Sequence, residues 1–177
     1  ISLDFSGLVV ATDEDGDNFV LGEASFVVMV EDDVPAQDDE GSVTGHVDED
    51  ELDDGITDGD AETTTASGTI SGLVNFGADQ PGHFGFAALT DAASGLFSDG
   101  EAVTYTTSDV DLDGVLDTLT ATAGTRTVFT LSLATDGSWT FTLLDQLDHV
   151  PVDNMNDDME ISLDFSGLVV ATDEDGD

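Results

Sequence analysis

The chain has 177 residues, and 41 of them are Asp or Glu against a single basic side chain, Arg126, so the formal net charge is −40. This charge repels DNA, RNA and anionic lipid, so we expect neither a nucleic-acid partner nor direct membrane insertion. A hydrophobic content of 39% is too high for a disordered acidic chain, and the absence of cysteine excludes disulfides.

The N-terminal sequence ISLDFSGLVVATDEDGD, residues 1–17, recurs unchanged as residues 161–177. Residue 161 corresponds to residue 1, so the offset is 160 residues. A period of this length is that of a whole domain and is far too long for one unit of a solenoid. We therefore expect a slice of a tandem array, whose partners are neighbouring identical repeats in the same polypeptide.

Alternation of apolar and polar residues dominates the chain and predicts an all-β fold, an immunoglobulin-like (cadherin-like) antiparallel β-sandwich. The clearest feature is a hairpin in which Thr135-Asp136-Gly137 joins strands over 126–134 and 138–144, with Trp139, Phe141 and Leu143 facing the core. The other predicted elements are strands at 1–5, 18–30 (with a bulge near Gly22), 42–47, 68–74, 84–89, 102–107 and 118–122, and a short helical turn within 86–97.

A domain boundary is predicted where an apolar strand gives way to Glu31, Asp32 and Asp33, followed by Val34 and Pro35. Proline ends ladder pairing, which favours a junction at this point. We expect residues 1–33 to be the C-terminal strands of the preceding repeat and 34–35 to end a calcium-binding linker. Residues 36–177 would then be a sandwich that lacks its final strand, whose sequence is that of residues 18–30.

The strongest local motif lies between the strands predicted at 102–107 and 118–122. Carboxylates stand at positions 1, 3, 5 and 9 of an EF-hand-type calcium loop, with glycine at position 6 and a backbone carbonyl at position 7. These residues are Asp109, Asp111, Asp113, Asp117, Gly114 and Val115. Position 12 is Thr120, so a bidentate carboxylate must come from elsewhere; an Asp-rich turn without metal is the alternative.

Other acidic groups are predicted to bind metal with less specific spacing. They are Asp13, Asp15 and Asp17 (repeated within 173–177), the junction residues Glu31, Asp32 and Asp33, and the tracts 47–62 and 145–160. Solvated acidic turns are the alternative for the first group and for the two tracts. The junction residues are expected to share a cation with loops of the following domain. Calcium or the concentrated salt of a halophile could offset the charge, and the regular Asp spacing favours several calcium ions per repeat as the cofactor.

No enzyme is expected. The chain has no cysteine nucleophile, and no serine stands in a nucleophile-elbow sequence. Paired carboxylates of the glycosidase type carry no signal in a chain with 41 acidic residues.

Several segments resemble the tandem repeats of giant RTX adhesins, which Gram-negative bacteria export by type I secretion: VEDDVP, VDEDELDDG, NFGADQPG, RTVFTLSLATDGSWTFTLLDQLDH and ISLDFSG…DEDGD. The resemblance covers nearly the whole period. It implies extracellular, cell-surface extender domains, linked end to end and stiffened by calcium, that project terminal ligand-binding domains in attachment or biofilm formation. The alternative function is a calcium-dependent carbohydrate- or surface-binding module.

Overall fold

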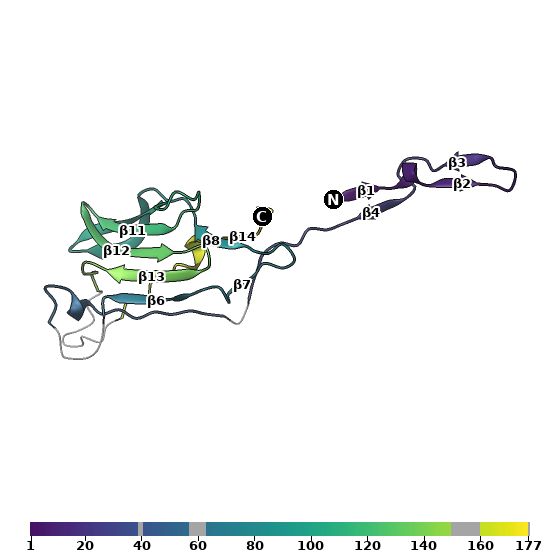
Figure 1. Cartoon of the computed structure of the whole chain (residues 1–177). Coiled ribbons are helices and arrows are strands. Elements are labelled where there is room, and N and C mark those ends of the chain that lie inside the picture. Colours follow the sequence, from purple (N-terminus) through teal and green to yellow (C-terminus); the bar gives the residue numbers. More distant parts are fainter. Residues whose placement is uncertain (39–40, 57–62, 150–159, 177) are drawn as a thin grey trace. The chain divides into compact units, whose positions relative to one another are not determined.

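The computed structural model describes residues 1–38, 41–56, 63–149 and 160–176, and the chain divides into two compact units, Ile1–Val34 and Pro35–Asp177 (Figure 1). The first unit contains four short strands and one 3₁₀ turn. These are β1 (Ser2–Asp4), η1 (Ser6–Leu8), β2 (Val10–Thr12), β3 (Asn18–Val20) and β4 (Val27–Met29). Strand β1 pairs with β4 and β2 pairs with β3, both antiparallel.

The single strand predicted over 18–30 is wrong, because the segment forms β3 and β4 with a turn between them. Ala24 adopts φ 60°, and the Ser25 N–H donates to the Gly22 carbonyl at 3.3 Å. Side chains of the preceding segment hold this turn, since the Ala24 N–H donates to Asp4 Oδ2 at 3.0 Å. The parity change near Gly22 therefore reflects a turn and not the predicted bulge.

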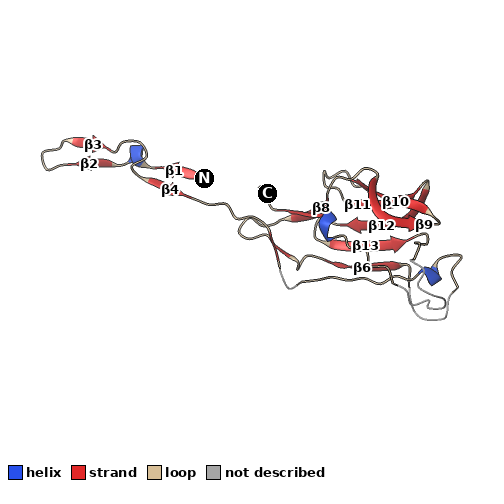
Figure 2. Cartoon of the chain, turned by 180° about the vertical axis from the view of Figure 1, so that it is seen from behind, coloured by secondary structure: helices blue, strands red, loops and turns tan. Residues whose placement is uncertain are grey.

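The second unit is built on a six-stranded antiparallel sheet (Figure 2). Its order is β6 (Thr65–Thr69), β13 (Ser138–Leu143), β12 (Arg126–Leu133), β11 (Thr118–Ala123), β10 (Glu101–Ser108) and β9 (Ala92–Ser98). Two short antiparallel pairs complete the strands, β8 (His83–Phe86) with β14 (Val169–Thr172) and β5 (Ala36–Gln37) with β7 (Val74–Asn75). The 3₁₀ turns of this unit are η2 (Glu49–Glu51) and η3 (Ser166–Leu168). The predicted all-β antiparallel sandwich is confirmed.

The core of the second unit lies on one face of the six-stranded sheet. Strand β11 alternates strictly and buries Leu119, Ala121 and Ala123, whereas its threonines are half-buried. Phe129 is fully buried and lies against the rings of Phe141 and Phe165, with centroids 4.9 and 6.0 Å away. The apolar residues of the repeated segment thus enter this core.

The predicted hairpin is confirmed as β12 and β13. Gly137 has φ 85°, a left-handed conformation that favours glycine, and the Ser138 N–H donates to Asp136 Oδ1 at 2.8 Å. Phe141 and Leu143 are buried, and the half-buried Trp139 packs against the core, as expected for one face of a strand.

Three weaker predictions need correction. Residues 42–47 form no strand, and 68–74 is divided between β6 and β7 by a turn. The helical turn expected within 86–97 is absent, because most of that segment is β9, which pairs with β10. No helix among the described residues is long and apolar enough to cross a membrane.

Candidate metal-binding loops

The loop 109–117 connects β10 to β11, in agreement with its predicted place between strands at 102–107 and 118–122. Leu112 and Gly114 both adopt left-handed conformations, with φ 65° and 98°. This backbone coils around the first carboxylate: Asp109 accepts the Leu112 N–H at 2.6 Å and the Gly114 N–H at 2.9 Å. The loop is therefore ordered by its own acidic side chain.

Three of the four predicted carboxylates converge in this loop. One oxygen each from Asp109, Asp111 and Asp117 lies within 4.8 Å of the others. Asp113 instead accepts the Val115 N–H at 2.8 Å and is not part of that group. The predicted use of the Val115 carbonyl as a ligand stays a prediction.

The electrostatics of the loop differ from one carboxylate to the next. For Asp111, the Asp113 N–H lowers the pKa, but desolvation and the charges of Asp113, Asp117 and Asp109 outweigh it, so the pKa is raised. For Asp117, desolvation raises the pKa, yet hydrogen bonds from Thr118, Val110 and Asp111 outweigh desolvation and lower it. Of Asp111 and Asp117, it is thus Asp111 whose charged form the loop disfavours.

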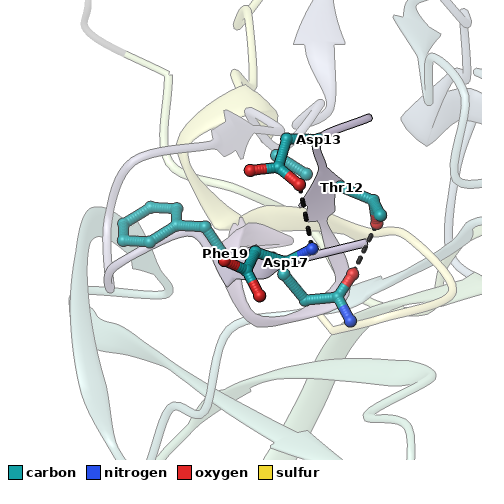
Figure 3. A pocket seen from close by; sticks show the side chains of 6 residues that line it. Thr12, Asp13, Asp17 and Phe19 are labelled. Carbon is teal, nitrogen blue, oxygen red and sulfur yellow. Dashed lines mark hydrogen bonds between the residues drawn. The ribbon is translucent and has the colours of Figure 1, made fainter. Parts of the chain in front are cut away.

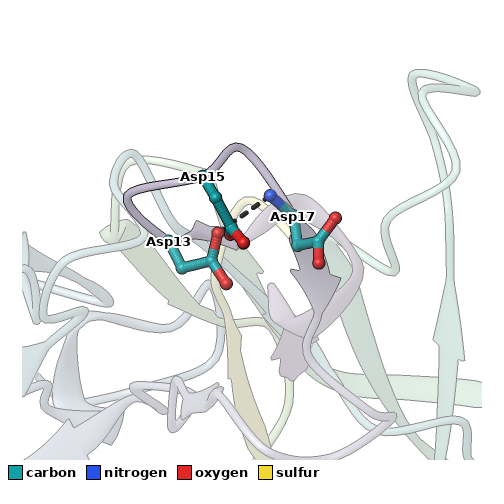
Figure 4. Close-up of side chains that lie close together, drawn as sticks. All are labelled: Asp13, Asp15 and Asp17. Carbon is teal, nitrogen blue, oxygen red and sulfur yellow. Dashed lines mark hydrogen bonds between the residues drawn. The ribbon is translucent and has the colours of Figure 1, made fainter.

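The loop of the first repeat copy brings together Asp13, Asp15 and Asp17, as the spacing predicted (Figure 4). The N–H groups of Gly16 and Asp17 donate to Asp13 Oδ1 at 3.1 and 2.9 Å. The Asp15 side chain, followed by the Asp17 N–H, lowers the pKa of Asp13. The loop borders an open hollow that Thr12 and Phe19 also line (Figure 3).

The corresponding loop of the second copy lies in a different setting. Asp173 is only 2% exposed and accepts the Gly176 N–H at 3.0 Å. Asp79 approaches this loop from the 76–82 segment: its carbonyl accepts the Glu174 N–H at 3.1 Å, and carboxylate oxygens of Asp79 and Asp175 lie within 4.8 Å. The sequence-based prediction missed Asp79, because only the fold brings it beside residues 173–176.

The remaining predicted ligands are less informative. Glu31, Asp32 and Asp33 are exposed at the end of the first unit, so their role at the junction stays a prediction. The tracts 47–62 and 145–160 extend beyond the described residues, which exclude 57–62 and 150–159.

Neither the loop 109–117 nor the loop 13–17 has a Lys or Arg side chain to offset its charge. Arg126, the only Lys or Arg in the sequence, forms an ion pair with Asp145 and donates to the Ser98 carbonyl at 2.9 Å. Glu101 lies 3.7 Å from the same guanidinium. Converging carboxylates without a cationic partner are suited to Ca²⁺, which takes six to eight oxygen ligands in flexible geometry.

Comparison with known proteins gives no relative. No protein-family model matches the chain, and neither a curated protein nor a solved structure matches it.

Proposed function

We propose that this chain is a structural extender repeat of a bacterial cell-surface adhesin of the RTX type. Calcium held by its acidic loops rigidifies the array, which projects terminal ligand-binding domains during attachment or biofilm formation. The observation that carries the proposal is the unchanged return of a seventeen-residue segment after one domain length. Identical repeats favour a role in which length and stiffness are the properties under selection.

Calcium is supported by the geometry of the two Asp loops. In each, three carboxylate oxygens lie within 4.8 Å of one another, and backbone N–H groups hold the carboxylates in place. Magnesium would demand near-ideal octahedral geometry, whereas calcium accepts irregular oxygen sets of this kind. A bound cation replaces mutual repulsion by shared coordination, so folding and metal binding should be coupled.

Export fits the same proposal. A chain without cysteine needs no disulfide formation after secretion. If folding requires calcium, the chain stays unfolded where calcium is scarce and folds on reaching an extracellular medium that contains it. We place the protein outside a Gram-negative cell on this reasoning and on the resemblance of its motifs.

The direct test is thermal unfolding in calcium, in magnesium and in EGTA at constant ionic strength. Trp139, the only tryptophan, lies in the second unit and reports that unit alone. We expect calcium to raise the melting temperature well above the values in magnesium and EGTA. Asp109→Asn with Asp117→Asn should reduce the calcium effect, whereas the control Asp91→Asn removes an exposed charge outside both loops and should not.

Two results would overturn the calcium proposal. Equal melting curves in all three solutions would show that the loops are turns. Stabilisation by concentrated monovalent salt alone would favour the halophile interpretation. Stiffening is tested separately by small-angle scattering on proteins of several repeats: the maximum dimension should increase linearly with repeat number in calcium and fall below that line in EGTA.

A further inference from the structure

The two copies of the repeated segment share the same 3₁₀ turn. Each contains a 3₁₀ turn at the same place, Ser6–Leu8 and Ser166–Leu168. In each, the serine N–H donates to the preceding aspartate, at 2.9 Å for Asp4 and 3.0 Å for Asp164. Differences between the copies therefore arise from what surrounds them.

The copies differ in their backbone partners. In the first copy, β1 pairs with β4, with Leu3 opposite Val28. In the second copy, the matching residues 162–164 form no strand, although Ile161, Leu163 and Phe165 pack against the core. The second copy has its apolar side chains in place, but within the part of the chain that the structure describes no strand pairs with residues 162–164.

Strands β2 and β14 are formed by matching residues of the two copies. Each pairs with its neighbour along the opposite edge. The Ala87 N–H donates to the Leu168 carbonyl at 2.9 Å, so even-numbered residues of the second copy face β8. In the first copy, the Leu21 N–H donates to the Val9 carbonyl at 3.3 Å, so odd-numbered residues face β3. Because alternate residues of an antiparallel strand pair on opposite sides, one segment can hold both neighbours at once.

The side chains of residues 18–30 also lie on the correct face. In the second copy, Val169 and Ala171 pack against the core. Ala11, which matches Ala171, lies opposite Phe19, and residues directly opposite in a ladder share a face. Phe19 is nevertheless 65% exposed, so an apolar side chain on the core-facing side of this ladder is left in solvent.

The same holds for β4. Phe26 lies 5.7 Å from the ring of Phe5 and is 48% exposed. Phe165, which matches Phe5, already packs against Phe129 and Phe141, with ring centroids 6.0 and 6.2 Å away. Phe26 from another copy would therefore extend the aromatic core of the second unit.

We propose that residues 18–30 of one copy add to the open edge of residues 161–172 of a second copy and close its sandwich beside β14. The sequence holds residues 18–30 once and their docking segment twice. The pairs that the donor gives up are remade with identical residues, so the net gain is burial of Phe19, Phe26 and Val28. The contact is head-to-tail.

The first test is the mass of the full chain in solution against concentration, by light scattering or sedimentation, in calcium and in EGTA. Head-to-tail contacts leave an open end on every assembly, so the mass should rise steadily above that of the monomer. The probe peptide NFVLGEASFVVMVEDD, residues 18–33, should return it to the monomer value, and a scrambled peptide should not. A monomer at all concentrations would overturn the proposal.

The second test uses the odd-numbered residues of the second copy, whose backbone groups face the open edge. Ala171→Pro removes an N–H that faces the open edge and leaves the even-numbered residues that face β8, so it should weaken association at least about tenfold while the Trp139 signal of folding is retained. The matched control Ala11→Pro disturbs only the donor's own pairing and should associate at least as strongly as the original chain.

Phe26→Asp provides a variant outside the second unit. It should abolish association without altering unfolding of the second unit, because Phe26 belongs to the first. If Ala171→Pro fails to fold, this variant decides the question. Association that survives Phe26→Asp and excess peptide would show that a different surface is used and would contradict the proposal.

Discussion

Residues 1–17 and 161–177 are the same sequence in two surroundings, and the contrast separates what a sequence fixes locally from what its neighbours supply. Gly16 and Gly176 both have φ 100°, so the loop backbone is a local property. Burial is not: Asp13 is exposed whereas Asp173 is 2% exposed. The surroundings, and not the segment, decide which of its groups leave solvent.

The largest difference should appear at the paired phenylalanines. Phe165→Ala removes a half-buried ring from the aromatic core and should destabilise the second unit by about 2–3 kcal/mol, less than the roughly 3–5 kcal/mol of a fully buried phenylalanine. Phe5→Ala is the matched control, because it deletes the same atoms from the first copy. Urea unfolding followed by Trp139 fluorescence measures both, and equal losses would break the comparison.

For the matching serines Ser6 and Ser166, the first copy should be the more sensitive to substitution. Ser6 is fully buried, and its Oγ accepts the Phe26 N–H at 2.8 Å, whereas Ser166 is exposed. Ser6→Ala leaves that N–H without its acceptor, so local opening should become easier by about 1–3 kcal/mol. Ser166→Ala should have little effect.

Amide hydrogen exchange of Phe26, measured at concentrations at which the chain is monomeric, is the test of the serine pair. Its exchange should accelerate in Ser6→Ala and stay unchanged in Ser166→Ala. Unchanged exchange in both variants would mean that the Ser6 hydroxyl does not hold the turn before β4.

The smallest effect concerns charge in the loop 109–117. The pKa of Asp111 is raised, so its charged form is disfavoured by folding, and this cost is present above that pKa and disappears as the pH falls through it. In EGTA at neutral pH, Asp111→Asn should therefore raise the melting temperature slightly, by less than about 2 °C. In calcium the same change should lower it, because a ligand is lost.

The sign reversal at Asp111 is the observation to look for. The gain in EGTA should vanish in acid, where Asp111 of the original chain is already protonated. A shift of the same sign in calcium and in EGTA would show that Asp111 does not bind the metal. Thermal unfolding at two pH values, with Trp139 fluorescence as the signal, is sufficient.

Local chemistry explains which parts of the fold could be predicted. Asp136 and Gly137 encode the hairpin of β12 and β13 within a few residues, and the prediction there is confirmed. The helical turn expected within 86–97 was wrong because pairing of β9 with β10 outweighs the helix preference of the alanines in that segment.

The candidate metal ligands also divide into those that the sequence could predict and those that it could not. Convergence of Asp13, Asp15 and Asp17 follows from odd spacing within one short loop. Asp79 had no comparable signal, because it reaches residues 173–176 only after strands distant in sequence have paired. Ligands contributed by different loops need the fold before they can be recognised.

The central inference is that the folded unit is completed by residues 18–30 of another repeat. The most direct measurement appends a second copy of residues 18–33 after Asp177, with an appended scrambled segment of equal length as control. We predict a monomer whose Trp139 transition lies about 5 °C or more above that of the original chain. An unchanged transition and unchanged association, equal to the scrambled control, would contradict it.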